Sequence, residues 1–249
     1  MSPSRRLRAN PPVDKYFPSD SLVIGAGVVI FHLATNRVVV CKDTRNDVWF
    51  LPKGRRDASE ETGVTAIREG FEEVCSYPLF HFPIFRIDYA DECKYLQSGY
   101  RNRLLPLPLP HIQPRPNGDA QKCDTEPIAT RLLPVATHYQ YMLFWYAAET
   151  LPCIETSLNA SASEAFALPP PFPANMTLAQ RVAEDQNEDG GVEEPKRHEG
   201  TGVDEDEAFY VGVLMGVEEA IEVLGGSSGD VVRRAWEGVC LRRKMEGEK

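Results

Sequence analysis

Cysteine is sparse in this sequence, and its spacing is irregular. Six cysteines occur among 249 residues, and no two of them form a C-x-x-C pair. Disulfide frameworks and zinc sites are typically marked by paired or regularly spaced cysteines, so the sequence favours neither kind of structure. We therefore expect a reducing compartment, cytoplasmic in the first place and nuclear as an alternative.

The sequence also has no apolar stretch long enough to span a bilayer. The longest run, Leu22 to Phe31, reaches about half of the ~20 residues that a membrane helix needs. Residues 1–12 carry three arginines but no apolar core, so a secretory signal peptide is not indicated. A transit peptide is one alternative, but the short, proline-interrupted stretch fits a basic tail better. We predict a flexible tail over residues 1–20 and no membrane partner.

An excess of basic residues is missing as well. The formal net charge is −10, and most of it lies in residues 184–207, where eleven acidic residues face only Lys196 and Arg197. The rest of the chain holds 26 acidic and 25 basic residues and is close to neutral. Without a broad basic face, the sequence gives no support to nucleic-acid binding.

A complete dinucleotide-binding fingerprint is absent too. Gly25 and Gly27 lie within VIGAGVVIF, a run with the composition of a strand, but no third glycine follows and no helix begins there. We interpret the two glycines as positions where another backbone or a ligand approaches the strand. No internal repeat is present.

One dense motif stands out against these absences, with the sequence LPKGRRDASEETGVTAIREGFEEVCS from Leu51 to Ser76. Five residues separate Gly54 from Glu60, seven separate Glu60 from Arg68-Glu69, and two more precede Glu72-Glu73. The stretch resembles the Nudix box, G-x5-E-x7-R-E-U-x-E-E-x-G-U, where U is a bulky apolar residue. Every charged position of that pattern is occupied, which makes the signal specific.

The motif departs from the box at three uncharged positions. Gly70 replaces the first U, Cys75 the last glycine, and Ser76 the final U. The combination of LPKGR with REGxEE is similar to fungal-type Nudix domains, in which this glycine is a variant of the box. We expect Gly70 to face the sheet and to let the helix pack closely, whereas Cys75 and Ser76 alter the cap at the helix end.

The motif itself predicts an α-helix from Thr62, as its N-cap, to Val74. Four apolar residues recur at helical spacing and form one buried stripe: Val64, Ile67, Phe71 and Val74. Glu69, Glu72 and Glu73 share the opposite face, where like charges repel each other. A hard divalent cation such as Mg²⁺ prefers such oxygen ligands. A solvated acidic face is the alternative for these three residues taken alone.

The loop before the helix favours a phosphate-binding function. Lys53, Arg55 and Arg56 are suited to phosphate oxygens, and Gly54 allows the backbone to come close to a metal or phosphate. The alternative is that Arg55 or Arg56 only forms surface pairs with nearby acidic residues.

Along the chain, patterning predicts strands over 23–31, 37–42, 48–51, 78–89 and 139–149, with the last one central. The Leu-Pro alternation within residues 91–124 predicts an extended loop insertion, with a docking motif as the alternative. Residues 151–207 have the composition of a disordered insertion. Two helices follow: one ends at Gly225-Gly226, and one runs from Val231 to about Lys244 with Asp230 as its cap.

The alternation of elements predicts an α/β fold, with helices covering a mixed sheet over residues 21–249. The resemblance implies a Nudix-type α/β/α sandwich and a hydrolase that cleaves a diphosphate bond with Mg²⁺ or Mn²⁺. It implies that Glu69, Glu72, Glu73 and the Gly54 carbonyl bind the metal, and that Glu60 and Arg68 brace the loop on the helix. Glu69 is a candidate catalytic base, and Glu126 or Glu149 a candidate extra ligand.

The expected substrate is a small phosphorylated molecule. A nucleoside diphosphate derivative, a dinucleoside polyphosphate and a diphosphoinositol polyphosphate are all compatible with the motif. Two other functions remain open: a catalytically silent Nudix module that binds a nucleotide or a protein, and an interaction protein that works through its insertions. The sequence does not identify protein partners of these insertions.

Overall fold

The computed structural model describes residues 14–74, 104–110, 122–135, 139–150, 171–184 and 209–247, together with residues 166, 168–169, 186 and 191–192. Ten strands and four helices are formed by these residues. The strands are β1 (Leu22–His32), β2 (Arg37–Asp43), β3 (Val48–Phe50), β4 (Lys53–Arg55), β5 (Leu104–Pro106), β6 (Leu109–Pro110), β7 (Cys123–Asp124), β8 (Ala129–Pro134), β9 (Gln140–Thr150) and β10 (Tyr210–Gly216). The helices are α1 (Thr62–Glu73), α2 (Leu178–Ala183), α3 (Val217–Leu224) and α4 (Gly226–Met245).

Eight of the strands form one mixed sheet, whose main order is β10-β2-β1-β9-β5. The two long strands β1 and β9 are parallel neighbours at its centre, paired from Leu22 with Gln140 to Phe31 with Glu149. All other pairings in the sheet are antiparallel, including β4 with β1 and β8 with β9. Strand β9 is therefore central, as the sequence predicted.

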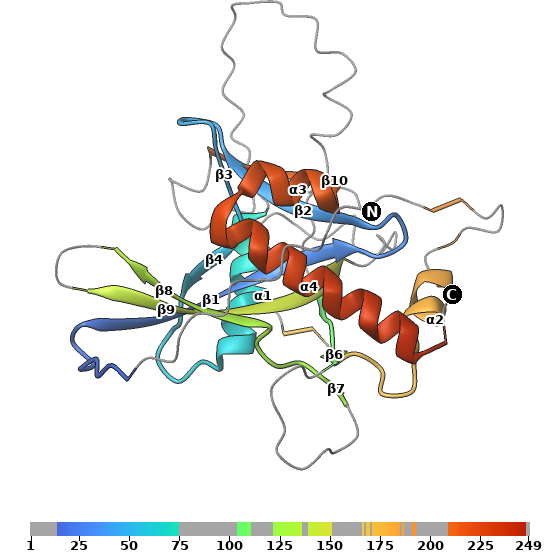
Figure 1. Ribbon diagram of the computed structural model, residues 1–249, viewed down its shortest axis with the longest axis horizontal. Coiled ribbons are helices and arrows are strands. Elements are labelled where there is room, and N and C mark those ends of the chain that lie inside the picture. The colour runs from blue at the N-terminus through green and yellow to red at the C-terminus, as the bar shows by residue number, and fades with distance from the viewer. Residues whose placement is uncertain are drawn as a thin grey trace, which may run out of the picture.

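Helices cover both faces of this sheet, with α4 in front of the strands and α1 behind them in Figure 1. Alternation along β1 explains the layers, because successive side chains point to opposite faces. Val28 and Ile30 pack with α1, whereas Val29 and Phe31 pack with α3 and α4. Burying each such side chain contributes about 1.5–3 kcal/mol. The predicted α/β class, with helices on a mixed sheet, is confirmed.

Helix α1 shows why Gly70 occupies a position where a bulky residue would be usual. A Cβ at Gly70 would lie 2.7 Å from Val28 Cγ1 and 2.9 Å from Leu104 Cδ1. The missing side chain thus lets α1 pack directly on β1, as expected. The predicted N-cap was wrong, however: Glu61 is the N-cap residue, and the Thr62 hydroxyl instead lies 2.7 Å from that of Tyr146.

Gly25 and Gly27 allow strand β4 to approach β1. A Cβ at Gly27 would lie 2.8 Å from the Pro52 carbonyl oxygen, and one at Gly25 would collide with the carbonyl oxygen of Gly54. The prediction that another backbone approaches these glycines is therefore confirmed. This backbone is the basic loop itself, which we had not expected to be a strand.

The Leu-Pro stretch differs from the predicted loop. Residues 104–106 form strand β5 against β9, and residues 109–110 form β6 against β7. Leu104, Leu105, Leu107 and Leu109 are buried in the core, so the alternating leucines serve as packing residues. The prolines are tolerated because β5 lies at the edge of the sheet.

Part of the stretch predicted to be disordered is also ordered. Helix α2 begins with a capping box between Thr177 and Gln180, and Leu178 is fully buried. The nearby Arg242 side chain, on α4, donates to the carbonyl oxygens of Pro108 and Met176 at 2.8 and 3.0 Å. These contacts fix residues 171–184 to the core, which a disordered insertion would not allow.

The C-terminal part adds a strand that the sequence analysis did not predict. β10 pairs with β2 before α3 begins, and α4 starts at Gly226, so Asp230 lies inside the helix and pairs with Arg233 instead of capping it. Helix α3 ends at Leu224, as expected.

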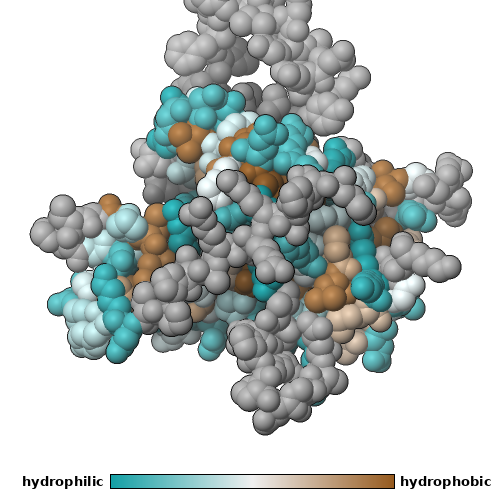
Figure 2. Space-filling model, viewed as in Figure 1, coloured by the Kyte–Doolittle hydropathy of each residue, from teal (hydrophilic) through white to brown (hydrophobic). Residues whose placement is uncertain are grey.

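Some predictions lie outside the described residues. They concern residues 1–13, Cys75 and Ser76, the strand over 78–89, and most of the two insertions at 91–124 and 151–207. Within the described part, none of the helices is long and apolar enough to cross a membrane. Where described residues are visible in Figure 2, hydrophobic patches are separate and lie among hydrophilic residues.

Candidate functional site

The motif brings helix α1 and strand β4 into direct contact. The Glu69 carboxylate lies against the Cα of Gly54, in the space that a side chain at that position would fill. One turn further along α1, Glu73 Oε2 accepts a hydrogen bond from the Lys53 backbone N–H at 2.6 Å. Two of the three predicted carboxylates therefore lie beside the basic loop, and both are largely buried.

Arg68 connects almost every charged residue of the motif. Its guanidinium donates to both carboxylate oxygens of Glu60 at 3.0 Å. It also donates to Glu69 and to Glu72, each at 2.8 Å, and to the Arg55 carbonyl oxygen at 2.9 Å. The ion pair expected between Arg68 and Glu60 is present. One nitrogen of the same guanidinium bridges Glu69 and Glu72; its contact with Glu72 has the i,i+4 spacing of helix neighbours, whereas its contact with Glu69 was not expected.

Glu60 is held by residues of the loop and of the first helical turn. Its Oε2 accepts hydrogen bonds from Thr65 Oγ1 at 2.8 Å and from the Asp57 N–H at 3.2 Å. Burial acts to raise the pKa of Glu60, but the hydrogen bonds from Arg68, Thr65 and Asp57 together outweigh it and lower the pKa. The hydrogen bond to Glu60 is the main reason that the pKa of Arg68 is raised. Both groups therefore stay charged at neutral pH.

The three basic residues of the loop lie in different environments. The Lys53 ammonium is 5.6 Å from the ring centroid of Phe50, and the Arg56 guanidinium donates to the Glu60 carbonyl oxygen at 3.2 Å. Arg55 is exposed. None of the ion pairs found among the described residues involves these three side chains, so the surface pairs considered as an alternative do not form.

Carboxylate oxygens are suitable ligands for a divalent cation, but in the present structure these side chains are not positioned around a common metal site. Three carboxylates, those of Glu60, Glu69 and Glu72, contact the Arg68 guanidinium, so this group has a formal excess of negative charge, and Glu73 lies beside it at the Lys53 N–H. Hard cations prefer such oxygen donors. No group of three or more His, Cys, Asp or Glu side chains in the described part of the chain is arranged to hold a metal ion, because Arg68 occupies the centre.

The two candidate extra ligands are not part of this cluster. Glu149 is fully buried and lies 3.5 Å from Arg181 of α2, on the opposite face of the sheet from α1. It cannot complete a site at Glu69, and the prediction for Glu149 is wrong. Glu126 lies at a cavity beside the beginning of α1, together with Glu61.

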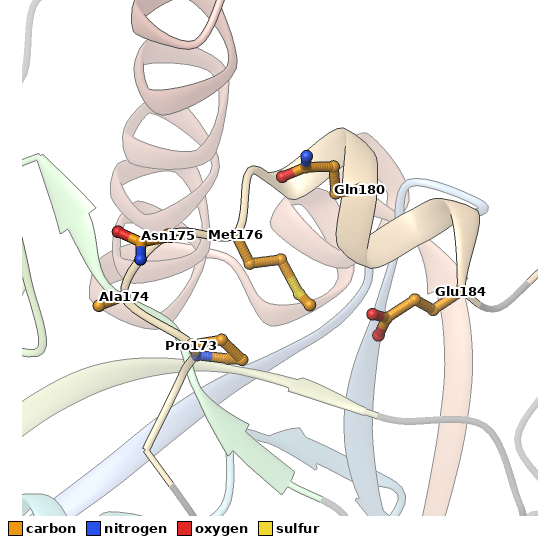
Figure 3. Close-up of a pocket in the computed structure, with 6 residues that line it drawn as sticks. All are labelled: Pro173, Ala174, Asn175, Met176, Gln180 and Glu184. Carbon is orange, nitrogen blue, oxygen red and sulfur yellow. The ribbon is translucent and has the colours of Figure 1, made fainter.

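Hollows that are lined by described residues also lie outside the cluster. One, of about 500 Å³, runs along the segment before α2, where Figure 3 shows Met176 and Glu184 projecting toward the same space. The residues of its lining that the structure describes include no lysine or arginine to bind a phosphate group. Another, of about 320 Å³, is enclosed by the first turns of α1 and by residues of β9.

The sequence analysis missed two residues that organise the site. Thr65 is fully buried and donates to Glu60, and its position four residues before Glu69, on the same helix face, was the available signal. Tyr146, hydrogen-bonded to Thr62, had no such signal, because its partner is 84 residues away in the chain.

Comparisons with known proteins give a limited result. No protein-family model and no curated protein matches the chain. Similar solved structures include an Ap4A hydrolase from C. elegans, with 14% identity and a TM-score of 0.39 over 86% of this chain and 95% of that one. A Nudix-family hydrolase from Clostridium perfringens has 12% identity and a TM-score of 0.38 over 88% and 96%. Likenesses this weak do not assign the chain to a family.

Proposed function

We propose that this protein is a metal-dependent hydrolase of the Nudix type, which cleaves a diphosphate bond in a small phosphorylated molecule. The observation that carries the proposal is the cluster around Arg68. Helical carboxylates, a bracing ion pair and a basic strand meet at one place, and the residues are those of the Nudix box.

In this proposal, residues of the basic strand β4 contact the phosphate groups, and residues of helix α1 provide the carboxylates. On the basic side, Lys53 and Arg55 present cations to phosphate oxygens, and Arg56 supports the loop through the Glu60 carbonyl. On the helical side, the Glu69 carboxylate lies against Gly54, and Glu73 accepts a hydrogen bond from the Lys53 N–H. Glu60 fixes Arg68, and Arg68 fixes the loop through the Arg55 carbonyl.

Mg²⁺ or Mn²⁺ would be held by Glu69, Glu72 and Glu73, with the Gly54 carbonyl as a further candidate donor. When bound, the ion would lower the pKa of a water molecule and neutralise phosphate charge. For this, Arg68 has to release Glu69 and Glu72 while it keeps Glu60. Its double contact with Glu60 makes such a rearrangement feasible, since one strong pair remains throughout. Glu69 remains our candidate for the catalytic base.

One observation favours the alternative of a silent module. In the present arrangement, Arg68 itself forms ion pairs with Glu69 and Glu72. If this guanidinium keeps its place, the motif would bind phosphates through the loop without holding a metal. The metal titration below separates the two functions.

The test combines binding with turnover. Isothermal titration of the protein with Mn²⁺ should show one saturable site that is lost in Glu72→Gln and Glu73→Gln. Nucleoside diphosphate derivatives, dinucleoside polyphosphates and diphosphoinositol phosphates are then assayed with Mg²⁺ and with EDTA. Metal binding with turnover of one class supports the hydrolase. Phosphate binding without metal binding supports the silent module, and neither kind of binding contradicts both.

A further inference from the structure

The cavity of about 320 Å³ lies on the other flank of α1 from the carboxylate cluster. Strand β9 pairs with one edge of β1 along nearly its whole length, so β4 and its Glu69 contact lie over the opposite edge. The cavity opens at the outer edge of β9, between the stretches paired with β8 and β5, where the Leu107 N–H donates to the Ala147 carbonyl oxygen at 3.0 Å. Strand β8 pairs with residues up to Trp145 and β5 begins its pairing at Ala148, which leaves Tyr146 and Ala147 at the gap.

The lining combines apolar walls with an acidic mouth. Val64, Ile67, Leu107 and the ring of Tyr146 provide the walls, and Glu61 and Glu126 are the charged residues of the lining. Both glutamates are exposed, and none of the described residues that line the cavity is a lysine or an arginine. Such a site repels phosphate and attracts a ring that carries hydrogen-bond donors. Its volume is at the lower end of the range for small-molecule sites.

The glycine at position 63 keeps the cavity beside the first turn of α1 free of a further side chain. It is the second residue of α1, where glycine weakens a helix by roughly 1 kcal/mol compared with alanine. Neither packing nor backbone conformation requires it: its φ is not positive, and a Cβ would lie 3.6 Å from the Tyr146 ring, an ordinary contact. A side chain at this position would, however, narrow the cavity, since Gly63 is part of its wall.

We propose that this cavity binds a planar heterocycle that bears an amino group, of the aminopurine type, without phosphate groups. The ring packs against Tyr146 and Leu107, and its amino group donates to the carboxylates of Glu61 or Glu126. Burial, together with the nearby charges of these two glutamates, raises the pKa of Tyr146, so the phenol remains neutral and adds its hydroxyl to the polar side. This site does not depend on the hydrolase activity proposed above, because it lies on the other flank of α1.

The test uses adenosine as the probe in equilibrium titrations with the full chain. Adenosine should bind saturably. Inosine, which lacks the amino group, should bind about tenfold more weakly. AMP should also bind more weakly than adenosine, because its phosphate meets the two glutamates. Gly63→Leu fills the cavity and should weaken adenosine binding at least tenfold. Gly216→Leu is the matched control, because a Cβ at Gly216 has no atom within 4 Å, and it should leave binding unchanged.

Glu126→Lys gives an independent test at an exposed side chain, where folding is not at risk. It should weaken adenosine binding and improve the binding of AMP relative to adenosine. The proposal is overturned if the wild type does not bind adenosine, if AMP binds more tightly than adenosine, or if a folded Gly63→Leu variant binds as the wild type does. Loss of turnover in the hydrolase assay would not affect these results.

Discussion

The Glu60→Gln variant should lower the free energy of unfolding at pH 7 by about 2 kcal/mol. The Glu60 side chain is 13% exposed and that of Arg68 15%, and two hydrogen bonds of 3.0 Å join them. Hydrogen bonds to charged groups contribute about 1.5–3 kcal/mol, whereas exposed ion pairs contribute less than about 1 kcal/mol. Glutamine keeps the size of the side chain but loses the charge and one acceptor oxygen. The loss should therefore be close to that of a charged hydrogen bond.

The loss should also depend on pH in one direction. Burial works to raise the pKa of Glu60, but the hydrogen bonds from Arg68 and Thr65 dominate, and the pKa is lowered in the folded chain. A group of this kind stabilises the fold fully above its unfolded pKa, about 4.3 for glutamate. The contribution disappears as the pH falls through the lower folded value. The difference between wild type and variant should be complete at pH 7 and should close below about pH 4.

Urea unfolding between pH 7 and pH 3 measures both effects. Glu237→Gln is the control, because Glu237 is half exposed and pairs with Arg234 at 3.4 Å on the surface of α4. This control should lose less than about 1 kcal/mol at any pH. The reasoning would be refuted if Glu60→Gln were as stable as the control variant, or if its deficit were the same at pH 3 and pH 7.

Four further predictions concern activity and packing. Glu72→Gln should lower turnover at least about a hundredfold with little change in unfolding, because a metal ligand is lost while the core remains; near-normal rates at limiting Mg²⁺ would exclude that role. Gly70→Ala should lower the melting temperature through a net loss of about 1–3 kcal/mol, because the methyl group meets Val28; an unchanged or higher value would contradict the tight contact. Deleting residues 155–205 should destabilise the fold, because it removes α2 with its buried core contacts, and calorimetry would show an unchanged transition if this were wrong. Arg55→Ala should raise KM most for the substrates richest in phosphate, and equal effects on all substrates would favour a purely structural role.

Most of the long elements, although not β10, were predictable because each has a strong local signal. β1, β2 and β9 are runs of apolar and β-branched residues, and α1 and α3 have apolar residues at helical spacing. Of the short strands, β3 was predicted from its apolar run, whereas β4, β5, β6 and β7 were not, because pairing creates them. Lys53–Arg55 has no strand composition and becomes β4 only because two glycines of β1 admit it.

Helix α2 shows a different limit. The composition of residues 151–207 favours disorder, and this average hides one capping box and one buried leucine, Leu178. What fixes the segment is remote in the sequence: Arg181 pairs with Glu149, and Glu246 accepts a hydrogen bond from the Leu178 N–H at 2.8 Å. Contacts across more than thirty residues cannot be inferred from local composition.

For the candidate site, the spacing of the motif predicted which charged residues would come together. It did not predict that Glu60, Glu69 and Glu72 would all contact the Arg68 guanidinium. The pairing of Glu60 with Arg68 followed from the motif. The contact of the same guanidinium with Glu72 follows from i,i+4 spacing on the helix, whereas its contact with the adjacent Glu69 is not specified by such a rule. The position of Glu149 behind the sheet likewise required the register of β9 with β1.

The most direct test of the central claim is ³¹P NMR of the products formed in water enriched in ¹⁸O. With Mg²⁺ and the substrate selected by the panel, the account predicts that ¹⁸O is found on a phosphorus atom of one product, which identifies hydrolysis of the diphosphate bond. The label should be absent with EDTA and reduced at least about a hundredfold in Glu73→Gln. Metal-independent labelling, or equal labelling by a folded Glu73→Gln variant, would contradict the proposed role of the α1 carboxylates.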